Sequence, residues 1–287
     1  MPKEDLESPS KAVQSTNLNT AYYRSFSDIP NAKKVAELVH AKEVVEAIIK
    51  GDGGIQTAAP LIPYFEARYK ALNALISKRK IKQVVEFAAG RTTRGLNNPQ
   101  WNYIYTEQDL EALNQMAEIT KQLGSKSAKP HFVQFDAITG AGMDDIIGLL
   151  KDEEVAVIHE GLITYYDFET KAKIARNAQR LLREFGGIYA TPDVHVKNRD
   201  MAHLVPNYEQ RERNRMKRIG RDLHSFRFDD AETARKFYEG LGFRVQTHRM
   251  GDFVQRLSSS EALFTDKAMR DRIDTTMKNR LVWEMTL

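Results

Sequence analysis

Residues 84–95 read VVEFAAGRTTRG, an apolar run that ends in small residues and continues into a helical pattern. Small residues at such a corner let backbone N–H groups and a helix N-terminus approach a polar ligand closely. The corner has one glycine, Gly90, which is too few for G-x-G-x-x-G, and the stretch lacks the lysine and following hydroxyl residue of a P-loop. Glu86 adds negative charge, so the stretch favours a cationic or hydroxyl-rich ligand over a pyrophosphate.

The same pattern of apolar run and helix continues to the end of the chain. The runs lie at 81–89, 102–109, 131–137, 154–163, 186–194, 243–249 and 280–287. Helical stretches lie near 94–98, 109–123, 142–151, 167–185, 230–240 and 261–278. Buried parallel strands covered by helices have this appearance. The sequence therefore predicts an α/β fold with a seven-stranded, doubly wound, Rossmann-like sheet.

Two segments depart from a minimal alternation of strands and helices. Residues 1–80 are predicted to begin with a polar disordered arm of about 20 residues. A helix over 32–51 and a second helix over 63–80 follow, and these two helices are predicted to form a lid. Residues 195–228 interrupt the domain 81–287 after its fifth strand and are predicted to be a substrate lid. Both segments can fold over the carboxyl ends of the strands, where ligands bind in open α/β sheets.

Composition narrows the class of protein. No apolar run reaches the roughly 20 residues that span a bilayer, and the polar start is unlike a secretory signal, so we expect a cytoplasmic protein without a membrane partner. The 287 residues include no cysteine, which excludes disulfides and thiolate metal sites, and no metal site is predicted. The net charge of +4 is mild, and the basic segment 209–221 is typical of a solvated helix, so no nucleic-acid partner is expected.

Acidic residues stand where four consecutive predicted strands end. They are Glu86 near the end of the first run, Glu107 and Asp109 at the end of the second, Asp136 at the end of the third, and Glu160 near the end of the fourth. A single acid at a strand end is more often a helix cap or a solvated turn than a ligand contact. Together they lie at one edge of the predicted sheet. There an acid after the second strand can accept ribose hydroxyl hydrogens, and one after the third an adenine amino group.

At these residues the sequence resembles a known family. EFAAGRTTRG is similar to the E-x-G-x-G motif of class I S-adenosylmethionine-dependent methyltransferases, and TTR resembles the D-T-R of the leucine carboxyl methyltransferase family. YTEQDLE resembles that family's second-strand motif, HEGLITYY its A-E-G-x-x-x-Y, and YFEAR its arginine-bearing segment. The resemblance runs from about residue 60 to the C-terminus.

The resemblance implies that S-adenosylmethionine is the cofactor and assigns its binding residues. The methionine and ribose side of the cofactor would be lined by Glu86, Ala88 and Gly90. Its carboxylate would pair with Arg68, and its amino or sulfonium end would face Glu160. The ribose would be held by Asp109 with Glu107, and the adenine would be flanked by Asp136 and Ala137. The chain departs from the pattern at Ala88, where the family has glycine, and at Thr92, where it has aspartate.

The expected reaction is in-line transfer of the sulfonium methyl group to an oxygen of a small molecule. A hydroxyl acceptor benefits from a base, for which His159, His195 and His203 are candidates, while Tyr165 transfers a proton or only packs the cleft. Ala88 and Thr92 keep a second interpretation open, a binding protein that retains the fold without catalysis. A dinucleotide-dependent oxidoreductase is a third, disfavoured by the glycine-poor loop. A homodimer is possible.

Overall fold

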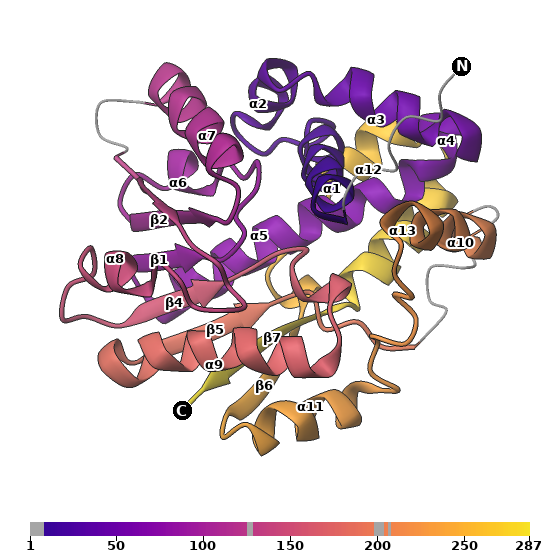
Figure 1. Cartoon of the computed structure of the whole chain (residues 1–287). Helices are drawn as coiled ribbons and strands as arrows, with labels where there is room; N and C mark the ends of the chain where they lie inside the picture. Colours follow the sequence, from indigo (N-terminus) through magenta and orange to yellow (C-terminus); the bar gives the residue numbers. More distant parts are fainter. Residues whose placement is uncertain (1–8, 125–128, 198–203, 206–207) are drawn as a thin grey trace, which may run out of the picture.

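A computed structural model describes residues 9–124, 129–197, 204–205 and 208–287 (Figure 1). Each apolar run contains a strand: β1 Gln83–Glu86, β2 Asn102–Glu107, β3 His131–Gln134, β4 Val155–Ile158, β5 Gly187–Thr191, β6 Arg244–Arg249 and β7 Leu281–Thr286. The order across the sheet is β3-β2-β1-β4-β5-β7-β6, in which β7 alone runs antiparallel to the other six strands. The predicted seven-stranded Rossmann-like sheet is confirmed for the described residues.

Helices cover both faces of the sheet. Successive strand residues point to opposite sides, so each face packs its own set of side chains against its helices. Val84 packs with one buried cluster and Val85 with the other. The first face is covered by α5 Ile62–Arg79, α7 Leu110–Leu123, α12 Ser258–Leu263 and α13 Lys267–Lys278, and the second by α8 Met143–Ile147, α9 Phe168–Phe185 and α11 Ala231–Gly240. Short α6 Arg94–Asn97 follows β1.

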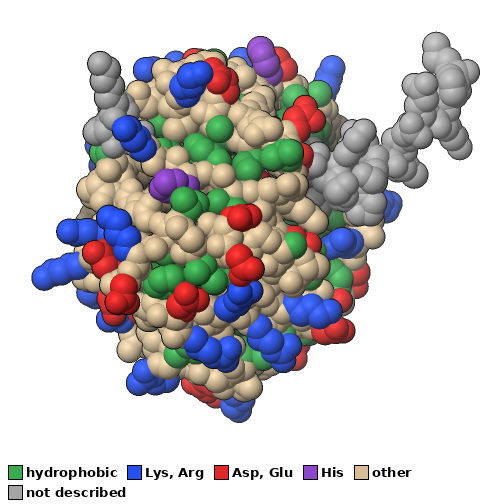
Figure 2. All heavy atoms as spheres, turned by 60° about the vertical axis from the view of Figure 1, so that its left-hand side comes forward, with side chains coloured by type: hydrophobic (Ala, Val, Ile, Leu, Met, Phe, Trp, Pro, Cys, Tyr) green, Lys and Arg blue, Asp and Glu red, His purple; other side chains and the backbone are tan. Residues whose placement is uncertain are grey.

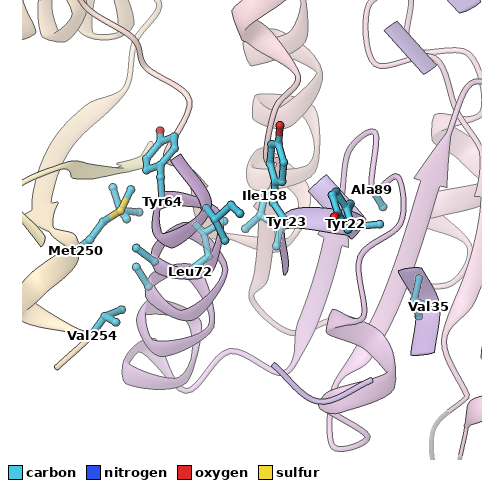
Figure 3. Close-up of a cluster of buried hydrophobic side chains, with 14 of the residues drawn as sticks. Tyr22, Tyr23, Val35, Tyr64, Leu72, Ala89, Ile158, Met250 and Val254 are labelled. Atoms are coloured by element: carbon cyan, nitrogen blue, oxygen red, sulfur yellow. The ribbon is translucent and has the colours of Figure 1, made fainter. Parts of the chain in front are cut away.

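The N-terminal segment differs from the prediction of a disordered arm. Residues from Pro9 onward form α1 Pro9–Arg24, and Ala21, Tyr22 and Tyr23 in its last turns are buried. Burying two tyrosines removes enough apolar surface from water to order a segment that is otherwise rich in polar residues. Figure 3 shows Tyr22 and Tyr23 in the same cluster as Leu72 of α5 and Ile158 of β4. The N-terminal helices therefore share the core of the sheet's first face.

The helix predicted over 32–51 is also broken in the structure. It forms α2 Ala32–Leu38 and α3 Ala41–Ile49, followed by a 3-10 turn at Lys50–Asp52, α4 Gly54–Ala58 and a second turn at Ala59–Leu61. The break falls at His40, whose φ of 51° is left-handed and ends an α-helix. Because of this break, Val35 of α2 and Val45 of α3 both point into the same buried cluster.

The insertion between β5 and α11 carries α10 Tyr208–Ile219. It returns to the domain through a parallel bridge between Val196 and Phe228, and Ile219 and Leu223 pack on Tyr165 after β4. Arg221 donates from Nη1 to the Tyr165 carbonyl over 2.9 Å. The insertion is thus fastened to the carboxyl edge of the sheet, where a substrate lid was predicted, and that role stays a prediction.

Charges of both signs are interspersed on the face of the molecule that carries α6, α7 and α8 (Figure 2). Arg180 and Asp144, for example, form an exposed ion pair over 2.6 Å between α9 and α8. Such pairs are solvated and contribute little to stability. No helix among the described residues is long and apolar enough to cross a membrane.

Candidate functional site

The loop after β1 has a backbone shape that suits glycine better than alanine. Ala88 has a φ of 49° and Gly90 a φ of 57°, both in the left-handed region. For an L-residue with a Cβ this region costs roughly 1–2 kcal/mol. Ala88 stands where the motif that this stretch resembles has its first glycine, and it therefore adopts a conformation that a glycine would adopt without strain.

Ala88→Gly should accordingly stabilise the fold. We expect the free energy of unfolding to rise by about 1 kcal/mol, because glycine removes the Cβ penalty and loses part of this gain to chain entropy. Denaturant titration measures the change, and Ala58→Gly in α4 is the matched control that should destabilise the protein. Equal losses in the two variants would contradict the strain argument.

Glu107, the last residue of β2, faces this loop. Its Oε1 accepts a hydrogen bond from the Gly90 N–H over 2.6 Å. Burial raises the pKa of Glu107 to about 7, although the Gly90 N–H and Arg91 act in the opposite direction. From the other side, α1 lies close enough that a Cβ on Gly90 would be 3.2 Å from Cγ of Asn17. The loop is held between β2 and the N-terminal helix.

The acids predicted for the ribose and adenine also support local backbone. Asp109 caps α7 by accepting from the Glu111 N–H over 3.0 Å. Asp136 accepts from the Ile138 N–H over 2.8 Å, and Ala137 beside it is buried. Asp109 thus caps a helix, and its predicted contact with the ribose stays a prediction. At the end of β2 it is Glu107, rather than Asp109, whose carboxylate contacts the Gly90 loop.

A cluster of buried charges fills the space where β1 and β4 end. Glu86 is 1% exposed and accepts from Nε of Arg94 over 3.0 Å and from the Tyr103 hydroxyl. Arg94, with no exposed surface, also contacts Glu160 and donates to the Tyr69 carbonyl over 3.1 Å. Burial raises the pKa of Glu86, and Arg94 opposes that rise. The carboxylate of Glu86 is thus already occupied by two partners of the protein itself, Arg94 and Tyr103.

Glu160 is the centre of this cluster. Its Oε1 accepts from Nε of Arg68 over 3.2 Å, and its Oε2 accepts from Nη2 of Arg24 over 2.7 Å. Burial alone would raise the pKa of Glu160, but Arg24, Arg94 and Arg68 together lower it. The structure therefore brings together two residues, Arg68 and Glu160, that were predicted from separate motifs to hold the methionine end of the cofactor.

Asp193, two residues after β5, lies on the other side of Arg68. Its Oδ2 accepts from Nδ1 of His159 and from the Leu162 N–H, each over 3.0 Å. Its Oδ1 lies 3.7 Å from Nη1 of Arg68 and has no hydrogen bond. Nη2 of Arg68 is likewise buried without a hydrogen-bond partner. Buried polar atoms are nearly always satisfied, so this adjacent donor and acceptor are available to a ligand.

The predicted catalytic residues lie in different surroundings. His159 is fully buried, and its Nε2 contacts the Tyr189 hydroxyl over 2.7 Å, so both of its ring nitrogens have partners. His195 is half-buried, with its ring centre 6.5 Å from that of Tyr64, and burial lowers its pKa to about 3. Tyr165 is buried against the insertion. His203 lies outside the described residues.

Three residues of the cluster had escaped the sequence analysis. Arg24 lies in the segment expected to be disordered, and its signal was the run AYYR, in which buried tyrosines precede the cation. Arg94 stands inside TTRG, but only the three-dimensional fold reveals that it points back at Glu86. Asp193 lies in TPDVH, two residues before His195, and only the histidine of this stretch was predicted to act.

No family model matches this chain, and no curated protein matches its sequence. Among solved structures, a duf574 family protein from Streptomyces avermitilis has a TM-score of 0.54 at 13% identity, covering 93% of this chain and 96% of that one. Magnesium protoporphyrin IX methyltransferase from Synechocystis PCC 6803 with bound SAH (S-adenosylhomocysteine) has a TM-score of 0.47 at 11% identity, covering 85% and 99%. PigF with SAH has 0.44 at 13%, covering 72% and 51%, so this chain spans about half of that protein.

With its strand order and the single antiparallel β7, the chain has the Rossmann-like fold of class I methyltransferases. At these identities the likeness concerns the fold alone and does not show an activity.

Proposed function

We propose that this chain is an S-adenosylmethionine-dependent methyltransferase of the leucine carboxyl methyltransferase type, acting on an oxygen of a small molecule. The observation that carries the proposal is the adjacent pair of unsatisfied atoms, Nη2 of Arg68 and Oδ1 of Asp193, beside Glu160. An amino-acid end offers a carboxylate to the first and ammonium hydrogens to the second. The site is thus matched to the methionine moiety of the cofactor.

The rest of the strand edge suits a nucleoside. Glu107 would accept the ribose hydroxyls, Asp136 and Ala137 would flank the adenine, and the backbone at Ala88 and Gly90 would form the floor. When bound, the cofactor supplies an electrophilic methyl group on sulfur. The protein's own part is to exclude water and to fix the cofactor's ends, since Arg24, Arg68 and Arg94 are almost fully buried.

Among the described residues, the site offers an acceptor little help with proton removal. Both ring nitrogens of His159 have partners, and His195 is neutral at physiological pH but only weakly basic. A carboxylate acceptor is already ionised and needs no base, whereas a hydroxyl acceptor does. The weak base favours an acceptor whose oxygen is ionised before it binds.

Titration calorimetry with SAH tests the proposal, and we expect affinity to depend on pH. The pKa of Glu107 is raised from 4.5 to about 7, so the folded protein holds this proton until the pH passes 7. An ionised carboxylate accepts ribose hydroxyls more strongly than a neutral carboxyl. The dissociation constant should therefore fall about tenfold from pH 6 to pH 8. For the same reason Glu107 stabilises the free protein at low pH, and this contribution is lost as the pH rises from 4.5 through 7.

The matched variants are Glu107→Gln and Asp109→Asn. In Glu107→Gln the pH dependence should disappear, while Asp109→Asn should bind normally, because asparagine caps a helix as well as aspartate does. No heat with millimolar SAH at either pH would refute the cofactor assignment. SAH binding without methyl transfer to any tested acceptor would favour the second candidate, a non-catalytic binding protein. The observation that supports this candidate is the left-handed backbone of Ala88 in the cofactor loop.

A further inference from the structure

Arg280, the residue before β7, is an arginine without an acidic partner. Its Nε is buried and has no hydrogen bond, and among the described residues no carboxylate forms an ion pair with its guanidinium. The guanidinium carbon lies 4.7 Å from the ring centre of Tyr64. The backbone is fixed on both sides, since the Arg280 carbonyl accepts from the Met250 N–H over 2.7 Å and its N–H donates to the Met277 carbonyl over 3.2 Å. Arg280 is therefore held in place without being neutralised.

Two acids act on the same neighbours as Arg280, Asp193 on His195 and Glu212 on Tyr208, and both are already paired with other cations. Asp193 contacts Arg68 and His159. Glu212 of α10 forms an ion pair with Arg227 at the end of the insertion. A half-buried guanidinium loses part of its hydration and gains no counter-charge here, which is unfavourable unless a ligand supplies one.

Arg280 also lies beside the predicted acceptor entrance. β7 runs antiparallel to β5, with Trp283 opposite Thr191, so the start of β7 meets the end of β5. Tyr64, under the guanidinium of Arg280, packs edge-on against His195 and donates to the Pro192 carbonyl over 3.3 Å. Arg280, Arg227 and Arg68 all act on His195, adding to the effect of burial in lowering its pKa. Positive charge thus converges on the half-buried histidine next to the methionine subsite.

The neighbouring helix extends this positive region. The described side chains of residues 209–221, in and after α10, include four basic ones, Arg211, Arg213, Lys217 and Arg221, and two acidic ones, Glu209 and Glu212. Burial raises the pKa of Tyr208, the first residue of α10, and both Arg227 and Arg280 oppose that rise, so this end of α10 lies within reach of the Arg280 charge. A positive surface at a cleft raises the local concentration of anions and speeds their association.

We propose that Arg280 binds an anionic group, a carboxylate or a phosphate, of the methyl acceptor. The inference rests on the proposed methyltransferase function and names its substrate class: small acids rather than neutral alcohols or amines. Tyr64 keeps the planar guanidinium oriented, and Nε with one Nη presents the two parallel donors that carboxylates and phosphates accept.

The test measures ligand binding to the SAH-loaded protein with matched pairs of probes. Benzoate and benzamide differ in charge but little in shape, as do hexanoate and hexanamide, while phenyl phosphate distinguishes phosphate from carboxylate. We expect the acids to bind at least about tenfold more tightly than their amides, because a carboxylate forms charge-assisted hydrogen bonds with arginine and an amide does not. In Arg280→Met this preference should disappear, and in Arg280→Lys part of it should return.

Arg180→Met, which removes an exposed paired arginine, is the control and should keep the preference. Thermal unfolding of each variant shows whether Arg280→Met is folded; if it is not, Arg280→Lys and Arg280→Gln serve in its place. Equal binding of acids and amides to the wild type, an unchanged preference in the variants, or binding of no acid would overturn the proposal. Failure of SAH to bind would refute the methyltransferase function itself, and the same probes then report on the free protein.

Discussion

Arg68→Met is expected to raise the dissociation constant of SAH about 100-fold, the largest effect on cofactor binding that we predict. Arg68 stands on α5 with Nε bonded to Glu160 and Nη2 buried without a partner. A carboxylate placed against this nitrogen forms a charge-assisted hydrogen bond worth about 1.5–3 kcal/mol. In a buried site this corresponds to a factor of roughly ten to a few hundred in affinity.

The same substitution leaves Glu160 with two arginines instead of three, so a structural loss must be separated from a binding loss. Arg68→Lys retains the charge but not the second donor and should recover only part of the affinity. Calorimetry of both variants, with unfolding curves beside them, makes the distinction. A variant that is destabilised yet binds SAH normally would assign Arg68 a purely structural role.

The strands were predictable from the sequence because each buried strand leaves a local record. Runs such as IKQVVEFAA carry apolar residues at adjacent positions, here Val84 and Val85, rather than at alternate ones, which is what coverage by helices on both faces requires. The order of the strands and the position of the site follow from general rules for doubly wound sheets. The resemblance of separate motifs then pointed to Arg68 and Glu160, which the structure places in contact.

What the sequence could not reveal depends on long-range packing. The α1 helix is polar on average, and its order comes from Tyr22 and Tyr23 packing on elements far along the chain, so no local pattern predicted it. For the same reason the partners of Arg94 were invisible. Asp109 and Glu107 are two residues apart, and only the capping geometry of α7 shows which one turns toward the Gly90 loop.

Arg94→Met should give the largest loss of stability, about 3–5 kcal/mol in the free energy of unfolding. The side chain has no exposed surface and contacts Glu86, Glu160, Asn73 and the Tyr69 carbonyl, with its guanidinium 4.5 Å from the Tyr69 ring centre. Removing one partner of a buried ion pair costs this much because the remaining charge is left unpaired. Removal of the exposed Arg180 should cost at most about 1 kcal/mol.

The double variant Arg94→Met, Glu86→Gln separates the charge effect from packing. If the loss arises from the unpaired Glu86, neutralising that residue should recover much of it, giving a coupling energy of about 1–3 kcal/mol in a denaturant-based cycle. The loss of unfolding free energy in Arg94→Met should also be smallest at low pH. There Glu86 is protonated in the folded and the unfolded state, so no unpaired charge is buried, and the loss grows as the pH rises. Additive losses that are independent of pH would instead mean that Arg94 acts by filling space between α5 and β1.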